Sequence, residues 1–271
     1  MSVAASGAGE RVLRFFAAAL GPVSVVIVAV VVQTVMHGLP PLVVALCVAL
    51  GAGGVYWLHT RYLERRVPVE LAPAGLPWFA GGVLGGIALI ALVMFSLALL
   101  GAYHLQGPSP VPVDLAAAAA GALATAVVEE VLFRGYLFRW IAGWNAWAAI
   151  GITSLVFGFA HAANPHATPF SSAAIAAEAG LLLGAAFWLS GNLWFPIGIH
   201  LGWNFAEGTI FSTPVSGSAA PGLILGTLSG PVALTGGAFG LEASVVALGT
   251  CTTAGIVLLV ACAVRHVTPV R

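Results

Sequence analysis

Residues 114–140 read DLAAAAAGALATAVVEEVLFRGYLFRW, an apolar helical stretch with Glu129, Glu130 and Arg134 about two-thirds of the way along it. Each charged side chain near the centre of a bilayer costs about 2.5–3.5 kcal/mol on insertion scales, so these three must have partners. Glu130 and Arg134 stand four residues apart on one helix face, which predicts an intrahelical ion pair. Glu129 is rotated about 100° from Glu130 and cannot share the same arginine equally well. One carboxylate is thus neutralised locally, and the other faces something else.

Two adjacent carboxylates out of water cannot ionise independently, and the nearby arginine splits the pair into two environments. We therefore expect Glu130 to stay ionised as the structural partner of Arg134 and Glu129 to be poised as a general base. A buried ion pair that only fixes helix packing would account for Glu130 and Arg134. It leaves Glu129 unexplained.

The composition places the chain among polytopic membrane proteins. Hydrophobic residues make up 60% of it, charged residues 7%, and the mean hydropathy is +1.05. The sequence contains no basic run and no nucleic-acid motif, so no nucleic-acid partner is expected. Cys47, Cys251 and Cys262 lie in apolar segments without CxxC or metal-ligand spacing and are interpreted as small core or lipid-facing residues.

The fold class predicted is an all-α polytopic transmembrane helical bundle. The apolar runs predict about eight spans, at residues 11–36, 40–58, 76–103, 114–140, 144–163, 171–189, 193–212 and 241–264. Residues 1–271 are treated as one transmembrane domain whose motif-bearing core is about 114–212. The Gly, Ser and Pro-rich segment 213–240 is expected to form a loop or a re-entrant segment. Asp114 is well placed to cap the fourth helix.

The arginines provide a test of this span count, because the chain has no lysine and an even number of spans puts all its basic residues on one side. By the positive-inside rule that side is the cytoplasm, with both termini there and the protein in the cytoplasmic membrane. The residues concerned are Arg11, Arg14, Arg61, Arg65, Arg66, Arg134, Arg139, Arg265 and Arg271.

Two more helices carry polar side chains at helical spacing. Phe157 and His161 stand four residues apart on the fifth span, and His200 and Asn204 stand four apart on the seventh. A lone histidine in an apolar helix is more often a satisfied core group than a catalyst. Two histidines, an amide and the spare Glu129 on three helices of one bundle instead predict a shared cavity, where inward-facing polar residues of membrane proteins collect.

The three elements EEVLFR (129–134), FGFAH (157–161) and HLGWN (200–204) also resemble, in order and spacing, the EExxxR, FxxxH and HxxxN signatures of a known family. This is the CAAX-protease and bacteriocin-processing family, abbreviated CPBP or ABI, whose members are intramembrane endopeptidases with the type II CAAX prenyl protease fold. The resemblance covers about residues 120–212. It implies a membrane protease that acts on a protein or peptide substrate at the lipid bilayer.

Carried over residue by residue, the resemblance implies a water-activating role for Glu129 and a water-orienting role for His161. It implies that Glu130 and Arg134 support the site, and that His200 and Asn204 stabilise the oxyanion of a tetrahedral intermediate. Amide hydrolysis needs such a base and such donors. Nothing in the sequence encodes recognition of a prenylated C-terminus, so leader peptides, signal peptides and bacteriocins are equally open as substrates.

Three alternatives stay open at this stage. Glu129, His161 and His200 could supply three ligands of a catalytic zinc with one open position, and the family is commonly labelled metalloprotease; because HExxH is missing, a metal-free glutamate mechanism is slightly favoured. A non-catalytic protein of the same fold, immunity-like or transport-like, could use the cavity to bind a ligand or protons. Glu178 lies in the sixth span and Glu207 in the seventh, where Glu207, three residues after Asn204, is interpreted either as a supporting group or as a residue that faces the loop at the helix end.

Overall fold

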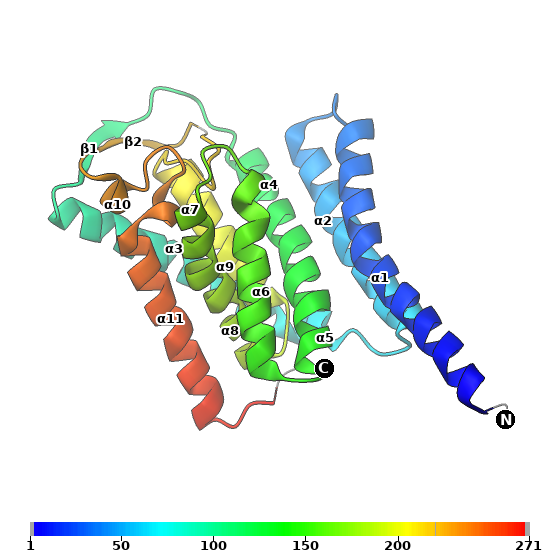
Figure 1. Ribbon diagram of the computed structural model, residues 1–271. Coiled ribbons are helices and arrows are strands. Elements are labelled where there is room, and N and C mark those ends of the chain that lie inside the picture. The colour runs from blue at the N-terminus through cyan, green and yellow to red at the C-terminus, as the bar shows by residue number, and fades with distance from the viewer. Residues whose placement is uncertain (1–2, 220, 269–271) are drawn as a thin grey trace.

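The structure is a computed structural model that describes residues 3–219 and 221–268, with side chains described from Ala19 onward. It is a bundle of long helices in which α1 and α2 form a hairpin beside the remaining helices (Figure 1). The long helices are α1 (Val3–Val35), α2 (Pro41–Leu58), α3 (Leu76–Leu99), α4 (Leu115–Glu130), α6 (Ala146–Ala160), α7 (Pro169–Ile175), α8 (Leu181–Ser190), α9 (Trp194–Phe205) and α11 (Val245–Val264). Short helices α5 (Arg139–Ala142) and α10 (Val232–Thr235) complete the α-helices.

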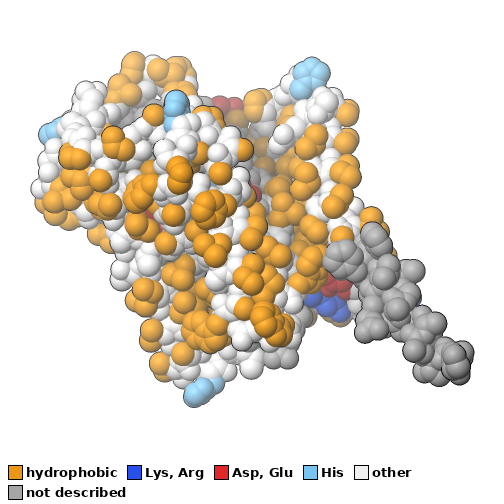
Figure 2. All heavy atoms as spheres, in the orientation of Figure 1, with side chains coloured by type: hydrophobic (Ala, Val, Ile, Leu, Met, Phe, Trp, Pro, Cys, Tyr) orange, Lys and Arg blue, Asp and Glu red, His pale blue; other side chains and the backbone are white. Residues whose placement is uncertain are grey.

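Six helical stretches in the described residues are long and apolar enough to cross a membrane. The other two predicted spans correspond to α1, whose apolar described part is the shorter stretch Ala19–Val35, and to α9 with the π-helical turn Ala206–Ile210 that continues it. The all-α transmembrane bundle is thereby confirmed. Apolar side chains are spread over the face of the bundle seen in Figure 2, as a lipid-facing surface requires.

The third predicted span is too long in the sequence reading, and the correction involves the segment 213–240. Helix α3 ends at Leu99, and Gly101, with φ +70°, reverses the chain. The next residues form strand β1 (Tyr103–Pro108), which pairs antiparallel with β2 (Ile224–Leu228). This pairing joins the two segments, and the described part of 213–240 lies across one end of the bundle as strand, turn and short helix.

Helix α4 begins where the sequence predicts. The Asp114 carboxylate accepts the N–H of Ala117 at 3.0 Å and so caps one of the free donors of the first turn. After Glu130 the helix widens into a π-helical segment, Val131–Phe138, which leads directly into α5. Insertions of this kind occur often at functional sites, and here the widened turns carry Arg134.

Helices α3 and α9 cross at close range because glycines line their contact. A Cβ on Gly82 or Gly86 would collide with backbone atoms of α9, and a Cβ on Gly198 or Gly202 would collide with the backbone of α3. Small residues that let two backbones approach in this way stabilise helix pairs in membranes. The crossing fixes α9, and with it His200, against the centre of the bundle.

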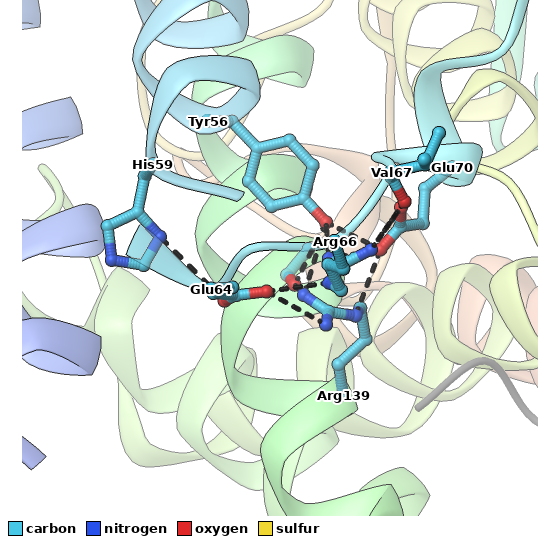
Figure 3. Close-up of polar contacts among 8 residues, drawn as sticks. Tyr56, His59, Glu64, Arg66, Val67, Glu70 and Arg139 are labelled. Atoms are coloured by element: carbon cyan, nitrogen blue, oxygen red, sulfur yellow. Dashed lines mark hydrogen bonds and ion pairs between the residues drawn. The ribbon is translucent and has the colours of Figure 1, made fainter. Parts of the chain in front are cut away.

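A network of charged residues closes the end of the bundle where α2 ends and α5 lies (Figure 3). Arg139 contacts Glu64 at 3.1 Å and Glu70 at 2.9 Å, while Arg66 contacts the same two carboxylates at 2.6 Å each. The Tyr56 hydroxyl donates to Glu70 at 2.8 Å. We call this the arginine end, and the opposite end, which carries β1 and β2, the sheet end.

Candidate active site

The three sequence elements line one cavity of about 520 Å³ between α4, α6, α9 and the helix formed by α7 and α8. Helix α4 contributes Glu129, the end of α6 contributes His161, and α9 contributes His200 and Asn204. The acid, the two histidines and the amide that the sequence predicts to share a cavity therefore line the same one. Glu178 also reaches the cavity wall, from the π-helical turn between α7 and α8.

Glu129 lies between the two histidines. Its Oε2 atom is 3.9 Å from Nε2 of His161 and 3.9 Å from Nε2 of His200. A water oxygen about 2.8 Å from both members of either pair would span that separation with an angle near 90°, so the separation suits one bridging water. Oε2 makes no hydrogen bond to any described residue, and the side chain is 25% exposed. The carboxylate is consequently available to a water or a substrate.

The orientation of His161 follows from the FxxxH spacing. His161 ends α6, and its Nδ1 lies 2.8 Å from the carbonyl oxygen of Phe157, one turn earlier. Because a carbonyl only accepts, Nδ1 must carry the proton, and the neutral ring then presents an Nε2 lone pair towards Glu129. The Phe157 ring packs against the imidazole, with 4.9 Å between ring centroids, and limits its rotation.

Glu130 is fully buried and connects two other members of the site. Its Oε1 atom accepts a hydrogen bond from Nη1 of Arg134 at 3.1 Å, which confirms the predicted intrahelical pair. The same oxygen lies 3.0 Å from Nδ1 of His200. An ionised carboxylate only accepts, so Nδ1 of His200 is the donor and its Nε2 faces Glu129.

Arg134, which is also fully buried, ties α4 to its neighbours. Its Nη2 donates to the carbonyl oxygens of Gly180 at 3.0 Å and Ala179 at 3.3 Å, both in the π-helical turn before α8. Its guanidinium carbon lies 4.5 Å from the centre of the Phe157 ring. A planar guanidinium suits this combination of forked hydrogen bonding and aromatic stacking.

Asn204 lines the cavity one turn beyond His200. Across the part of the chain that the structure describes, its side-chain amide makes no hydrogen bond to protein. The amide N–H groups are therefore free to donate to a group that enters the cavity. Asn204 and His200 stand on one face of α9, as their spacing predicts.

Two acids of the cavity wall were not assigned a catalytic role from the sequence. Glu178 is buried, and its Oε2 has no partner among the described residues. Glu242, which precedes α11, accepts hydrogen bonds from the N–H of Ser216 at 2.6 Å and its hydroxyl at 2.7 Å. Burial raises the pKa of Glu242, and the two bonds from Ser216 only partly offset that effect. An acid inside an otherwise apolar span, as at Glu178, is the one sequence signal that could have pointed to this wall.

Glu207 supports the site from outside the cavity. Its carboxylate accepts the indole N–H of Trp203 at 2.7 Å and the backbone N–H of Leu241 at 3.1 Å. It thereby joins the end of α9 to the segment before α11.

The side chains as placed do not fit a shared zinc ion. Two ligand atoms on one tetrahedral zinc lie about 3.3–3.5 Å apart, given bonds of about 2.0–2.2 Å. Both Nε2 to Oε2 distances are 3.9 Å, and within the described residues no group of three or more His, Cys, Asp or Glu side chains is arranged to hold a metal ion.

Comparison with known proteins agrees with the motif resemblance. Residues 110–206 match the family model described as type II CAAX prenyl endopeptidase Rce1-like, and this range contains all three motif elements. A search of the curated proteins and of the solved structures found no match. The resemblance predicted for about residues 120–212 is confirmed over most of that segment. Over residues 110–206 the chain is thus similar to the type II CAAX prenyl endopeptidases of the Rce1-like kind.

Proposed function

We propose that this protein is an intramembrane endopeptidase that hydrolyses a peptide bond with a water activated by Glu129. The observation that carries the proposal is the position of one carboxylate oxygen 3.9 Å from the Nε2 atoms of two histidines, inside a cavity of about 520 Å³. General bases act on a water within hydrogen-bond reach, and a separation of 3.9 Å suits one bridging water.

In the proposed first step, the water donates one proton towards Glu129 and the other towards Nε2 of His161, which positions its oxygen. The water oxygen attacks the carbonyl carbon of the peptide bond, and Glu129 takes the proton. The C–O bond forms as the carbonyl π electrons move to the oxygen, which becomes an oxyanion. Glu129 then gives its proton to the leaving nitrogen as the C–N bond breaks, so the acid is regenerated as a carboxylate.

His200 and Asn204 are the proposed donors to the oxyanion. Asn204 has a free amide, whereas His200 uses Nδ1 for Glu130 at 3.0 Å. His200 can donate from Nε2 only as an imidazolium, and the adjacent Glu130 carboxylate stabilises that cation. Donors fixed in a cavity away from bulk water are worth about 2.7–4 kcal/mol each in comparable oxyanion sites.

The proposal is tested with purified protein in lipid nanodiscs and a panel of quenched fluorescent peptides. Glu129→Gln keeps the shape of the side chain but removes the base, so we expect the cleavage rate to fall by about 10²–10⁴. We expect the cleavage rate of His161→Ala to fall by a comparable factor. His104→Ala, at an exposed position in β1, is the matched control and should cleave at the wild-type rate. Full activity in Glu129→Gln would refute the mechanism.

The same experiment separates the enzyme from the non-catalytic alternative. A ligand-binding or proton-relaying protein gives no cleavage in the wild type, while Glu129→Gln alters only binding or transport. Accumulated uncleaved precursors in cells carrying Glu129→Ala, compared with wild-type cells by proteomics, would identify the substrate, including whether it carries a prenylated C-terminus.

A further inference from the structure

The cavity extends from Glu129 towards only one end of the bundle, the sheet end. On α4 its lining residues run from Glu129 back to Ala118, about 16 Å towards the sheet end. On α9 and its continuation they run from Ile199 to Thr209, again towards the sheet end. Ser218, in the loop at that end, is exposed and lines the cavity. A second hollow, between the α1–α2 hairpin and α4, also extends from Glu129 to residues of the α1–α2 turn at the sheet end.

Towards the arginine end, the cavity is closed along α4. No residue of α4 or of the π-helical segment beyond Glu129, both of which are described throughout, lines the cavity. Val131, Tyr136 and Phe138 are buried, with at most 1% of each side chain exposed. The network of Arg66, Arg139 and their carboxylates then closes the bundle below them (Figure 3).

The two ends of the bundle also differ in charge, because the basic residues lie at the closed end and not at the end towards which the cavity extends. Apart from Arg134, the arginines whose side chains are described lie at the arginine end: Arg61, Arg65, Arg66, Arg139 and Arg265. At the sheet end the described loops carry the acids Asp114 and Glu242, histidines and neutral residues, and neither Lys nor Arg. The positive-inside rule, which weighs Lys and Arg near the ends of spans, places the arginine end in the cytoplasm.

From these three observations we infer that the catalytic cavity opens on the extracytoplasmic side of the membrane. The inference rests on the proposed function and names its substrate class. The scissile bond belongs to a peptide segment that has crossed or entered the membrane, such as a translocated precursor or the outer end of a membrane anchor. A soluble cytoplasmic C-terminus would meet the sealed end of the bundle.

The orientation is tested by labelling single cysteines in intact cells, independently of catalysis. In a background with Cys47, Cys251 and Cys262 replaced by alanine, Ser218→Cys reports the cavity mouth and Val67→Cys, an exposed loop position, reports the arginine end. A membrane-impermeant maleimide is expected to label Ser218→Cys in intact cells and Val67→Cys only after the membrane is disrupted. Labelling of Val67→Cys in intact cells, or of Ser218→Cys only after disruption, overturns the inference.

Entry through the mouth is tested on the same two proteins after purification. A bulky maleimide on Ser218→Cys is expected to lower peptide cleavage by about tenfold or more, whereas the same label on Val67→Cys leaves the rate unchanged. Equal rates in the two labelled proteins contradict entry at the sheet end. Absence of cleavage in both proteins before labelling counts against the proposed function alone, because the labelling pattern in cells still reports the orientation.

Discussion

Replacing Arg134 with methionine removes the cation from the centre of the bundle while keeping much of the side-chain volume. The change leaves the Glu130 carboxylate with only His200 as a partner and takes the donor away from the carbonyls of Ala179 and Gly180. Removing one member of a buried ion pair costs about 3–5 kcal/mol because the other charge stays buried without compensation. For a chain of this size each kcal/mol lowers the Tm by about 2–4 °C, so Arg134→Met is expected to lower it by about 6–20 °C.

The cause of that loss is tested by a double-mutant cycle with Glu130→Gln, followed by thermal unfolding in detergent with tryptophan fluorescence. If the stranded charge is responsible, the double variant loses less than the sum of the two single variants, with a coupling of about 0.5–3 kcal/mol. The reasoning is refuted if Arg134→Met unfolds at the wild-type temperature, or if the two losses simply add.

Three further outcomes are expected. Gly86→Ala should lower the stability by about 1–3 kcal/mol because its Cβ meets the α9 backbone, whereas Gly85→Ala on the open side of α3 should not; equal Tm values would contradict the glycine crossing. Burial opposes ionisation of Glu64, but Arg139 and Arg66 outweigh it and lower its pKa, so its stabilising effect is present above the ordinary pKa of 4.5 and is lost as the pH falls through the lower folded value. The Tm difference between wild type and Glu64→Gln should therefore shrink below pH 4.5. A difference that widens on acidification would show that ionised Glu64 does not stabilise the fold. Active purified protein should hold less than one zinc per chain and keep its activity in EDTA; stoichiometric zinc that is lost together with activity in His161→Ala would show that the 3.9 Å spacing closes around a metal.

Sequence reasoning succeeded where one strong physical constraint acts on a regular helix. The cost of burying charge in lipid, combined with the helical period, was enough to predict the ion pair of Glu130 with Arg134. The same constraint predicted that Glu129, His161 and His200 share a cavity. The cap at Asp114 followed from chemistry local to four residues.

The features it missed depend on contacts between segments with no common period. Glu64 and Glu70 pair with Arg139 across the bundle, and no local pattern links a loop after α2 to the end of α4. The pairing of β1 with β2 joins segments more than a hundred residues apart, and the glycine that ends α3 looks like many other glycines in this chain. The π-helical widening at Val131–Phe138 leaves no mark on the hydrophobic pattern.

The adjacent glutamates divide stability and chemistry between them, and their surroundings explain how. Glu130 is held by Arg134 and His200 and has no exposed surface, so its charge belongs to the packing of the bundle. Glu129 has an oxygen without a hydrogen-bond partner in the described chain and borders the cavity, so its charge contributes little to packing. It follows that Glu129→Gln should remove cleavage while the protein keeps its Tm, and that Glu130→Gln should lower both. A fold that tolerated Glu130→Gln but collapsed with Glu129→Gln would assign the two roles the other way round.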